Sequence, residues 1–117
     1  MELSGKALKD FWIWYLLPEQ QKEYKTSSII KYASENGAKV RFLAMSFAER
    51  YGVFVDFFDS VGLVIDIQPC SCHKPTIFNV NIIKPMMDFI EIDEKKNRQE
   101  ARISAIKKVN EIYNLQL

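Results

Sequence analysis

The first apolar pattern in the chain has the spacing of a helix. Large apolar side chains recur three, four, seven and eight positions apart, which places them on one helix face. These residues are Leu8, Phe11, Trp12, Tyr15 and Leu16. Ser4 is placed as the N-cap and Pro18 as the stop. Ile13 and Trp14 fall off that face, so the helix must be covered on more than one side, by the rest of the fold or by a partner.

A short second helix is predicted from about Thr26 to Asn36 and Gly37. Glycine just after a helix readily adopts the left-handed stop conformation. Lys39 and Arg41 then lead into a connector. The residues of this helix expected to point inward are Ile29, Ile30 and Ala33.

Ser46 marks the clearest helix start. Ser46 and Glu49 form a capping box, in which the Ser46 hydroxyl takes the backbone N–H of Glu49 and the Glu49 carboxylate returns to the N–H of Ser46. Gly62 fits the stop. Asp56 and Asp59, with Glu49, lie roughly opposite the apolar side. That side carries Phe47, Tyr51, Phe54, Val55, Phe58 and Val61, with Val53 and Phe57 on its flank.

After Gly62 the apolar period changes to that of a strand. Alternate residues are apolar over 63–68 and over 78–83, which predicts two strands with one buried face. Residues 69–75 form the turn between them. Pro85 breaks the second strand, and residues 86–92 are interpreted as a third.

The last helix opens at Asn97, a cap residue followed by Glu100, and runs to about Asn114. The predicted order is α-α-α-β-β-β-α. We expect an α+β fold with a three-stranded antiparallel sheet packed on helices. Residues 1–117 are interpreted as a single domain, with a helical cover in 1–41 and an α-β-β-β-α core in 46–114. This core has the order and size of a double-stranded-RNA-binding domain, a similarity of topology.

Composition and charge narrow the function classes. The 117 residues are 48% hydrophobic and contain no apolar run of the roughly 20 residues that a membrane span needs. With no signal-peptide pattern, a cytoplasmic protein without membrane partners is expected. The net charge of +1 combines +2 over residues 1–41, −4 over 42–93 and +3 over 94–117. This excludes uniform coating of nucleic acid and leaves a directional contact open.

Four basic residues crowd the start of the last helix: Lys95, Lys96, Arg98 and Arg102. The helix dipole is positive there, so acidic residues are the usual choice. One interpretation is an anion or phosphate site beside unpaired helix N–H groups. The other is a set of solubilising residues whose stems lie over the sheet edge. The acidic stripe of Glu49, Asp56 and Asp59 would repel phosphate, which weighs against duplex RNA.

Residue types suited to metal binding occur together only at Cys70, Cys72 and His73. Structural zinc needs four ligands, and the chain has no second cluster of cysteine or histidine. We therefore expect no metal or other cofactor. A disulfide between Cys70 and Cys72 is disfavoured in the cytoplasm and by the single residue that separates them, so we expect two reduced thiols in a turn. His73 is the only imidazole and no glycine-rich phosphate loop is present, so a non-enzymatic protein is expected.

Five short motifs relate the chain to a known group. They are WYLLPE (residues 14–19), FFDSVG (57–62), RQEAR (98–102), AIKK (105–108) and NEIYN (110–114). In them the chain resembles small uncharacterised proteins of Bacteroidota phages and prophages. The motifs coincide with helix caps and core positions, so the resemblance implies a shared fold. It also implies a phage context and a place of action in the cytoplasm of an infected bacterium.

The leading hypothesis is a phage-encoded binding protein that engages a host protein or ribonucleoprotein. Its most concrete version is inhibition of an antiviral defence such as a CRISPR effector. Aromatic anchors are typical of protein interfaces. The expected interface residues are Trp12, Trp14 and Phe57, with Glu49, Asp56 and Asp59. Two alternatives stay open: an RNA-binding or other nucleic-acid-binding module that uses the four basic residues, and a structural or accessory phage protein that self-associates through its first helix.

Overall fold

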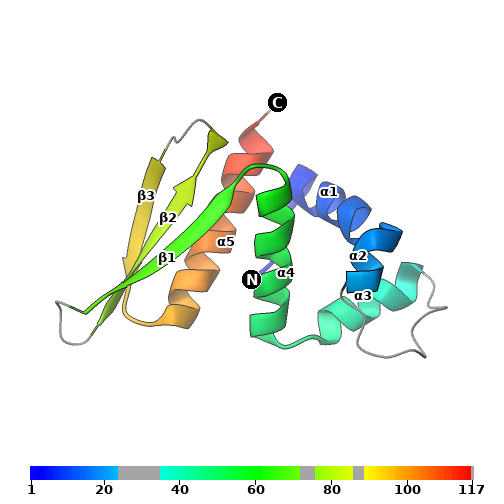
Figure 1. The fold of residues 1–117 in the computed structure, drawn as a ribbon, viewed down its shortest axis with the longest axis horizontal. Coiled ribbons are helices and arrows are strands. Elements are labelled where there is room, and N and C mark those ends of the chain that lie inside the picture. The colour runs from blue at the N-terminus through cyan, green and yellow to red at the C-terminus, as the bar shows by residue number, and fades with distance from the viewer. Residues whose placement is uncertain (24–34, 72–75, 86–88, 117) are drawn as a thin grey trace.

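The computed structural model describes residues 1–23, 35–71, 76–85 and 89–116 (Figure 1). The helical elements precede the sheet, and one long helix follows it. In chain order the elements are α1 (Gly5–Tyr15), α2 (Pro18–Glu23), α3 (Glu35–Ala44), α4 (Phe47–Ser60), β1 (Val64–Cys70), β2 (Ile77–Ile83), β3 (Phe89–Lys95) and α5 (Arg98–Leu115).

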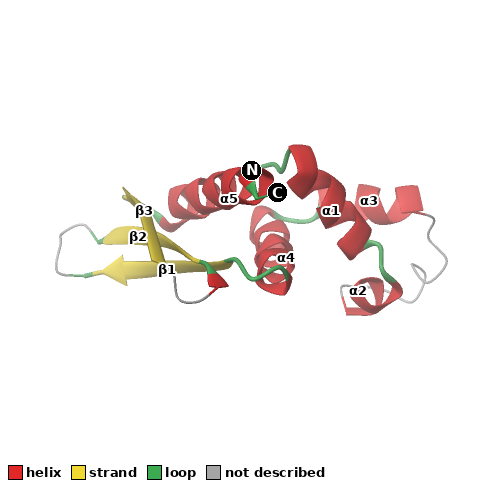
Figure 2. Cartoon of the chain, turned by 90° about the horizontal axis from the view of Figure 1, so that it is seen from above, coloured by secondary structure: helices red, strands yellow, loops and turns green. Residues whose placement is uncertain are grey.

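The strands form an antiparallel meander in the order β1-β2-β3. Ile65 lies opposite Ile82 and Ile67 opposite Val80, so the apolar alternation of the two strands shares one face. Figure 2 shows α5 along one face of the sheet, where it packs against β2 and β3. Val80 and Ile82 are fully buried. The expected α+β fold class, with its meander and final helix, is confirmed.

Phe11 of α1 lies at the centre of an aromatic cluster that joins three helices. Its ring centroid is 5.1 Å from that of Phe42 in α3, and 5.0 Å and 5.5 Å from those of Phe54 and Phe57 in α4. The rings are tilted or edge-to-face, arrangements worth about 0.5–1.5 kcal/mol per pair beyond area burial. The cluster therefore fixes α1 and α3 beside α4, away from the sheet (Figure 2).

The two helix starts predicted from capping residues are confirmed. The Ser46 hydroxyl accepts the backbone N–H of Glu49 at 3.2 Å, as predicted. The Glu49 carboxylate accepts a hydrogen bond from the Ser46 hydroxyl at 2.9 Å, in place of the predicted bond from the Ser46 backbone N–H. Asn97 accepts the backbone N–H of Glu100 at 2.8 Å. Gly62 follows α4 with φ +85°, a conformation that side chains with a Cβ rarely adopt.

The start of α1 is held by α5. Ser4 occupies the expected N-cap position, but its side chain makes no cap hydrogen bond. Instead the Asn114 amide oxygen accepts the backbone N–H of Ala7 at 2.7 Å, and its amide nitrogen donates to the Ser4 carbonyl at 2.9 Å. Asn110 accepts the Ser4 backbone N–H at 2.9 Å and donates to the Ser4 hydroxyl at 3.0 Å. These four bonds fix the N-terminal segment, residues 1–4, against the rest of the fold.

The second predicted helix is wrong in its end point. Asn36 and Gly37 lie inside α3, and Lys39 and Arg41 belong to this helix rather than to a connector. Ala38 and Phe42, one turn apart on α3, are buried, and this tertiary burial outweighs the preference of glycine for a helix stop. The positions expected to begin and fill that helix, Thr26, Ile29, Ile30 and Ala33, lie outside the described residues.

The third strand lies three residues later than expected, at 89–95 instead of 86–92. Its pairing with β2 continues to Lys95, which lies opposite Phe78, and the register shifts between Val80 and Asn81. Such a shift adds one residue to β3 and interrupts its period-two alternation, so the apolar pattern is a poor guide to the bounds of this strand. The first three residues of the expected strand, 86–88, lie outside the described residues.

Cys70, the last residue of β1, is disulfide-bonded, which corrects the expectation of two reduced thiols. That expectation rested on the redox state of the cytoplasm, which the fold does not encode, and on the single residue that separates the two cysteines in the sequence. Cys72 and His73 lie outside the described residues. None of the helices in the described ranges has the length and apolar character that crossing a membrane requires.

Candidate binding surface

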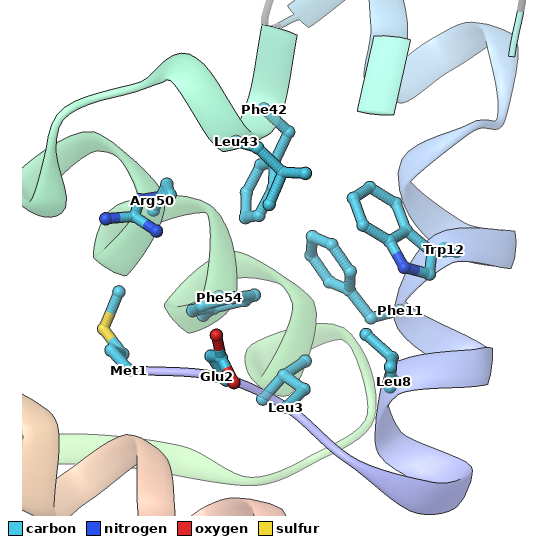
Figure 3. A pocket seen from close by; sticks show the side chains of 10 residues that line it. All are labelled: Met1, Glu2, Leu3, Leu8, Phe11, Trp12, Phe42, Leu43, Arg50 and Phe54. Atoms are coloured by element: carbon cyan, nitrogen blue, oxygen red, sulfur yellow. The ribbon is translucent and has the colours of Figure 1, made fainter. Parts of the chain in front are cut away.

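A cavity of about 270 Å³ opens between the N-terminal segment and helices α1, α3 and α4 (Figure 3). Its aromatic residues are Phe11, Trp12, Phe42 and Phe54. Phe11, Phe42 and Phe54 are core residues, so this part of the wall is set by the packing that joins the helices. The remaining lining residues are Met1, Glu2, Leu3, Leu8, Leu43 and Arg50. The cavity is thus largely apolar, with one acidic and one basic side chain.

Arg50 of α4 is the basic residue in this wall, and Figure 3 shows it across the cavity from Trp12. Its Nε atom is buried and has no hydrogen-bond partner among the described residues. A buried donor without a partner costs about 1–3 kcal/mol. The folded chain therefore holds an unsatisfied donor in the wall of an apolar cavity.

The rim of the cavity carries exposed apolar side chains. Leu43 of α3 is 63% exposed and Leu8 of α1 is 38% exposed, and both line the cavity. Val40, one turn before Leu43 on α3, is 65% exposed. We call the surface formed by Leu8, Trp12, Val40 and Leu43 the α1–α3 surface. Because two helices contribute neighbouring apolar groups around one cavity, it differs from the single exposed leucines of ordinary protein surfaces.

The expected aromatic anchors occupy three different settings. Trp12 is half-buried on the α1–α3 surface, where its ring meets that of Phe42 edge to face at 5.4 Å and the Lys39 ammonium lies 5.3 Å from its centroid. Trp14 is half-buried and its ring centroid lies 5.5 Å from that of Phe57. Phe57 is only 1% exposed, so it belongs to the core and its assignment to an interface is corrected. The apolar flank of α4 faces α1, which the helical period alone did not decide.

The acidic stripe lies where it was expected. Glu49, Asp56 and Asp59 are all exposed along α4. Partial desolvation of the Asp59 carboxyl raises its pKa above the usual value, and the neighbouring Asp56 charge raises it further. Glu49 is also engaged with the Ser46 hydroxyl as part of the helix cap. The stripe is therefore a surface of negative charge on α4, and it disfavours contact with phosphate.

The basic residues at the start of α5 are largely engaged within the fold. The Lys95 ammonium lies 3.0 Å from the Asp93 carboxylate. The Arg98 guanidinium lies over the Phe78 ring at 5.0 Å, and that of Arg102 over the Tyr51 ring at 5.1 Å. Lys96 is exposed. Arg98 thus lies over a ring of β2 and Arg102 over a ring of α4, so only Arg98 lies over the sheet, while a bound anion stays untested.

A second, shallow cavity of about 480 Å³ lies between β3 and α5. It is lined by Asp93, Lys95, Glu100, Ile103, Ser104 and Lys107. Its charges are partly paired, since Asp93 binds both Lys95 and the Ser104 hydroxyl. In the described part of the chain, no group of three or more metal-ligating side chains comes together.

Sequence reasoning missed most of the α1–α3 surface. Val40 and Leu43 fall in the segment interpreted as a connector, although their spacing of three residues was a helical signal. Arg50 carried no signal in the sequence, because its role depends on a cavity formed by the N-terminal segment, α1, α3 and α4. Trp12 is the expected interface residue that the structure places on this surface.

Comparisons with protein-family models, with curated proteins and with solved structures found no match to this chain.

Proposed function

We propose that the chain is a non-enzymatic binding protein that engages another protein through the α1–α3 surface. The observation that supports this most is the exposure of Val40 and Leu43 beside a cavity with an aromatic wall. Burying one such side chain completely contributes about 1.5–3 kcal/mol, so a few of them suffice as anchors of an interface.

The resemblance to phage and prophage proteins suggests what the partner is. In that context the partner is a host protein or ribonucleoprotein, and the concrete role we propose is interference with an antiviral defence such as a CRISPR effector. A small domain can block such an effector by occupying a functional surface, without any chemistry of its own. The α1–α3 surface is the part of the described chain best suited to that contact.

Nucleic-acid binding is the second candidate, and the number of basic residues around the start of α5 favours it. Their engagement with Asp93, Phe78 and Tyr51 weakens the case, since a phosphate must compete with these contacts. Self-association is the third candidate, because an apolar surface can also meet a second copy.

The test is capture of partners from a bacterial lysate by the tagged chain, with and without nuclease. The matched variants are Leu43→Lys, which charges the α1–α3 surface, and Ile103→Lys, which charges a half-exposed apolar site on α5. Both variants should unfold at the same urea concentration as the wild type. We expect nuclease-resistant capture of a specific protein that Leu43→Lys abolishes and Ile103→Lys retains.

Other outcomes of these experiments would support one of the two other candidate functions. Capture that nuclease removes, and that weakens steeply with salt, supports nucleic-acid binding. A doubled mass in size-exclusion chromatography, lost in Leu43→Lys, supports self-association. Equal capture by wild type and Leu43→Lys contradicts the proposed surface.

A further inference from the structure

The cavity beside the α1–α3 surface combines two features that restrict its ligand. Phe11, Trp12, Phe42 and Phe54 supply aromatic wall, while Arg50 supplies a permanent positive charge (Figure 3). A dry apolar cavity of about 150 Å³ already accommodates a benzene ring. At about 270 Å³ this cavity suits one aromatic or branched aliphatic side chain with part of its backbone.

The Nε–H of Arg50 has no hydrogen-bond partner among the described residues. This Nε atom is buried, and within the described residues no ion pair joins Arg50 to Glu2, the one acidic residue of the cavity wall. An arginine guanidinium binds a carboxylate through two parallel N–H···O bonds, stronger than bonds between neutral groups. A carboxylate of a bound partner matches both the charge and the fork of donors of this side chain.

We propose that the cavity recognises a partner segment in which an aromatic or branched aliphatic side chain stands beside a carboxylate. The apolar group fills the cavity and the carboxylate binds the Arg50 guanidinium. This inference rests on the proposed function, since it specifies which chemistry of a protein partner the α1–α3 surface selects. A lone apolar residue leaves the Arg50 donor unsatisfied, and a lone carboxylate leaves the cavity unfilled.

Small probes separate the two requirements. The probes are 3-phenylpropionate, its neutral amide 3-phenylpropionamide, and propionate, which lacks the ring. Nitrogen–proton NMR spectra of the full chain report the Trp12 indole N–H and the Arg50 Nε–H directly. We expect 3-phenylpropionate to shift both signals at millimolar concentration and to bind roughly tenfold more tightly than the amide. Propionate should not shift the Trp12 signal.

Three variants test the charge assignment. Arg50→Gln should remove the preference for the carboxylate over the amide, while Lys39→Gln, which removes a nearby charge from outside the cavity wall, should retain it. Glu2→Gln, an exposed substitution that leaves the core untouched, should strengthen 3-phenylpropionate binding by removing a repelling charge. If Arg50→Gln fails to fold, the Glu2→Gln result and the wild-type probe series still show whether the cavity prefers a carboxylate.

The inference is overturned if the acid and the amide bind equally, if binding shifts neither signal, or if Glu2→Gln weakens binding of the acid. These outcomes leave the proposed function standing when Leu43→Lys still abolishes partner capture. Failure of capture together with positive probe binding overturns the proposed function and identifies the cavity as a site for small aromatic acids.

Discussion

Asn114 carries out a helix-capping task from a distant part of the sequence. Its side chain accepts the N–H of Ala7 and donates to the carbonyl of Ser4, while Ser4 itself leaves the N-cap role unused. Both partners lie more than one hundred positions away in the chain, so local pattern could place Ser4 but not its capping group. The contact matters for the site, because it anchors the segment whose Met1, Glu2 and Leu3 wall the cavity.

Asn114→Ala should lower the free energy of unfolding by about 1–3 kcal/mol, because it leaves the Ala7 N–H and the Ser4 carbonyl without their partners. Urea denaturation followed by circular dichroism measures this. Gln99→Ala, at an exposed position on α5, serves as the control and should stay within about 0.5 kcal/mol of wild type. Equal stability of the two variants would show that the hydrogen bonds of the Asn114 side chain contribute nothing to stability.

Three tyrosines should make the free energy of unfolding depend on pH in the alkaline range. Burial raises the pKa of Tyr15, Tyr51 and Tyr113 above the usual value of 10.0, with smaller effects from their neighbours. A raised folded-state pKa contributes stability that is present below the unfolded pKa and is lost as pH rises through the folded value. We expect the urea midpoint to fall from about pH 9 to about pH 11, and to fall less in Tyr51→Phe. A midpoint that rises over this range contradicts the assignment.

At the scale of single residues the sequence was informative wherever the partner is local. Ser46, Asn97 and Gly62 were placed correctly because caps and stops act within one helical turn. Phe57 was misplaced on the surface, and Arg50 was not recognised, since both assignments depend on which helices pack together.

At the scale of elements, two glycines of the same region should respond oppositely to alanine. Gly62 has φ +85°, and a Cβ there would lie 3.2 Å from the Pro85 ring, whereas Gly52 inside α4 faces open space. Gly62→Ala should destabilise the fold by more than about 1 kcal/mol. Gly52→Ala should stabilise it by about 0.5–1 kcal/mol, since alanine is the better helix former. Thermal unfolding of both variants measures this, and the same sign for both would contradict the helix stop.

The sequence pattern predicts some elements correctly and fails for α3. The helix over 47–60, the first two strands and the last helix follow from period, caps and alternation. For α3 the same rules gave the wrong boundary, because Asn36 and Gly37 suggested a stop while burial of Ala38 and Phe42 sustained a helix. Because the expected helix ended at Asn36 and Gly37, the sequence did not predict that Val40 and Leu43 lie together on a helix surface.

At the scale of the whole molecule, the α1–α3 surface and the basic start of α5 lie at opposite ends. The sheet and the basic start of α5 lie at one end, and α1, α2 and α3 at the other, with α4 between them (Figure 2). The net charge of +1 therefore describes no single face of the protein. Protein binding through the α1–α3 surface and anion binding through the basic start of α5 are distinct hypotheses that address different surfaces.

Site-specific photo-cross-linking shows directly whether the α1–α3 surface contacts a protein in the cell. A photoreactive amino acid is placed at position 43 on the α1–α3 surface or, as the control, at position 99 near the basic start of α5, and the chain is irradiated in bacterial cells. We expect one protein adduct of defined mass from position 43 and none from position 99. Adducts to nucleic acid from position 99, or no protein adduct from position 43, would contradict this expectation.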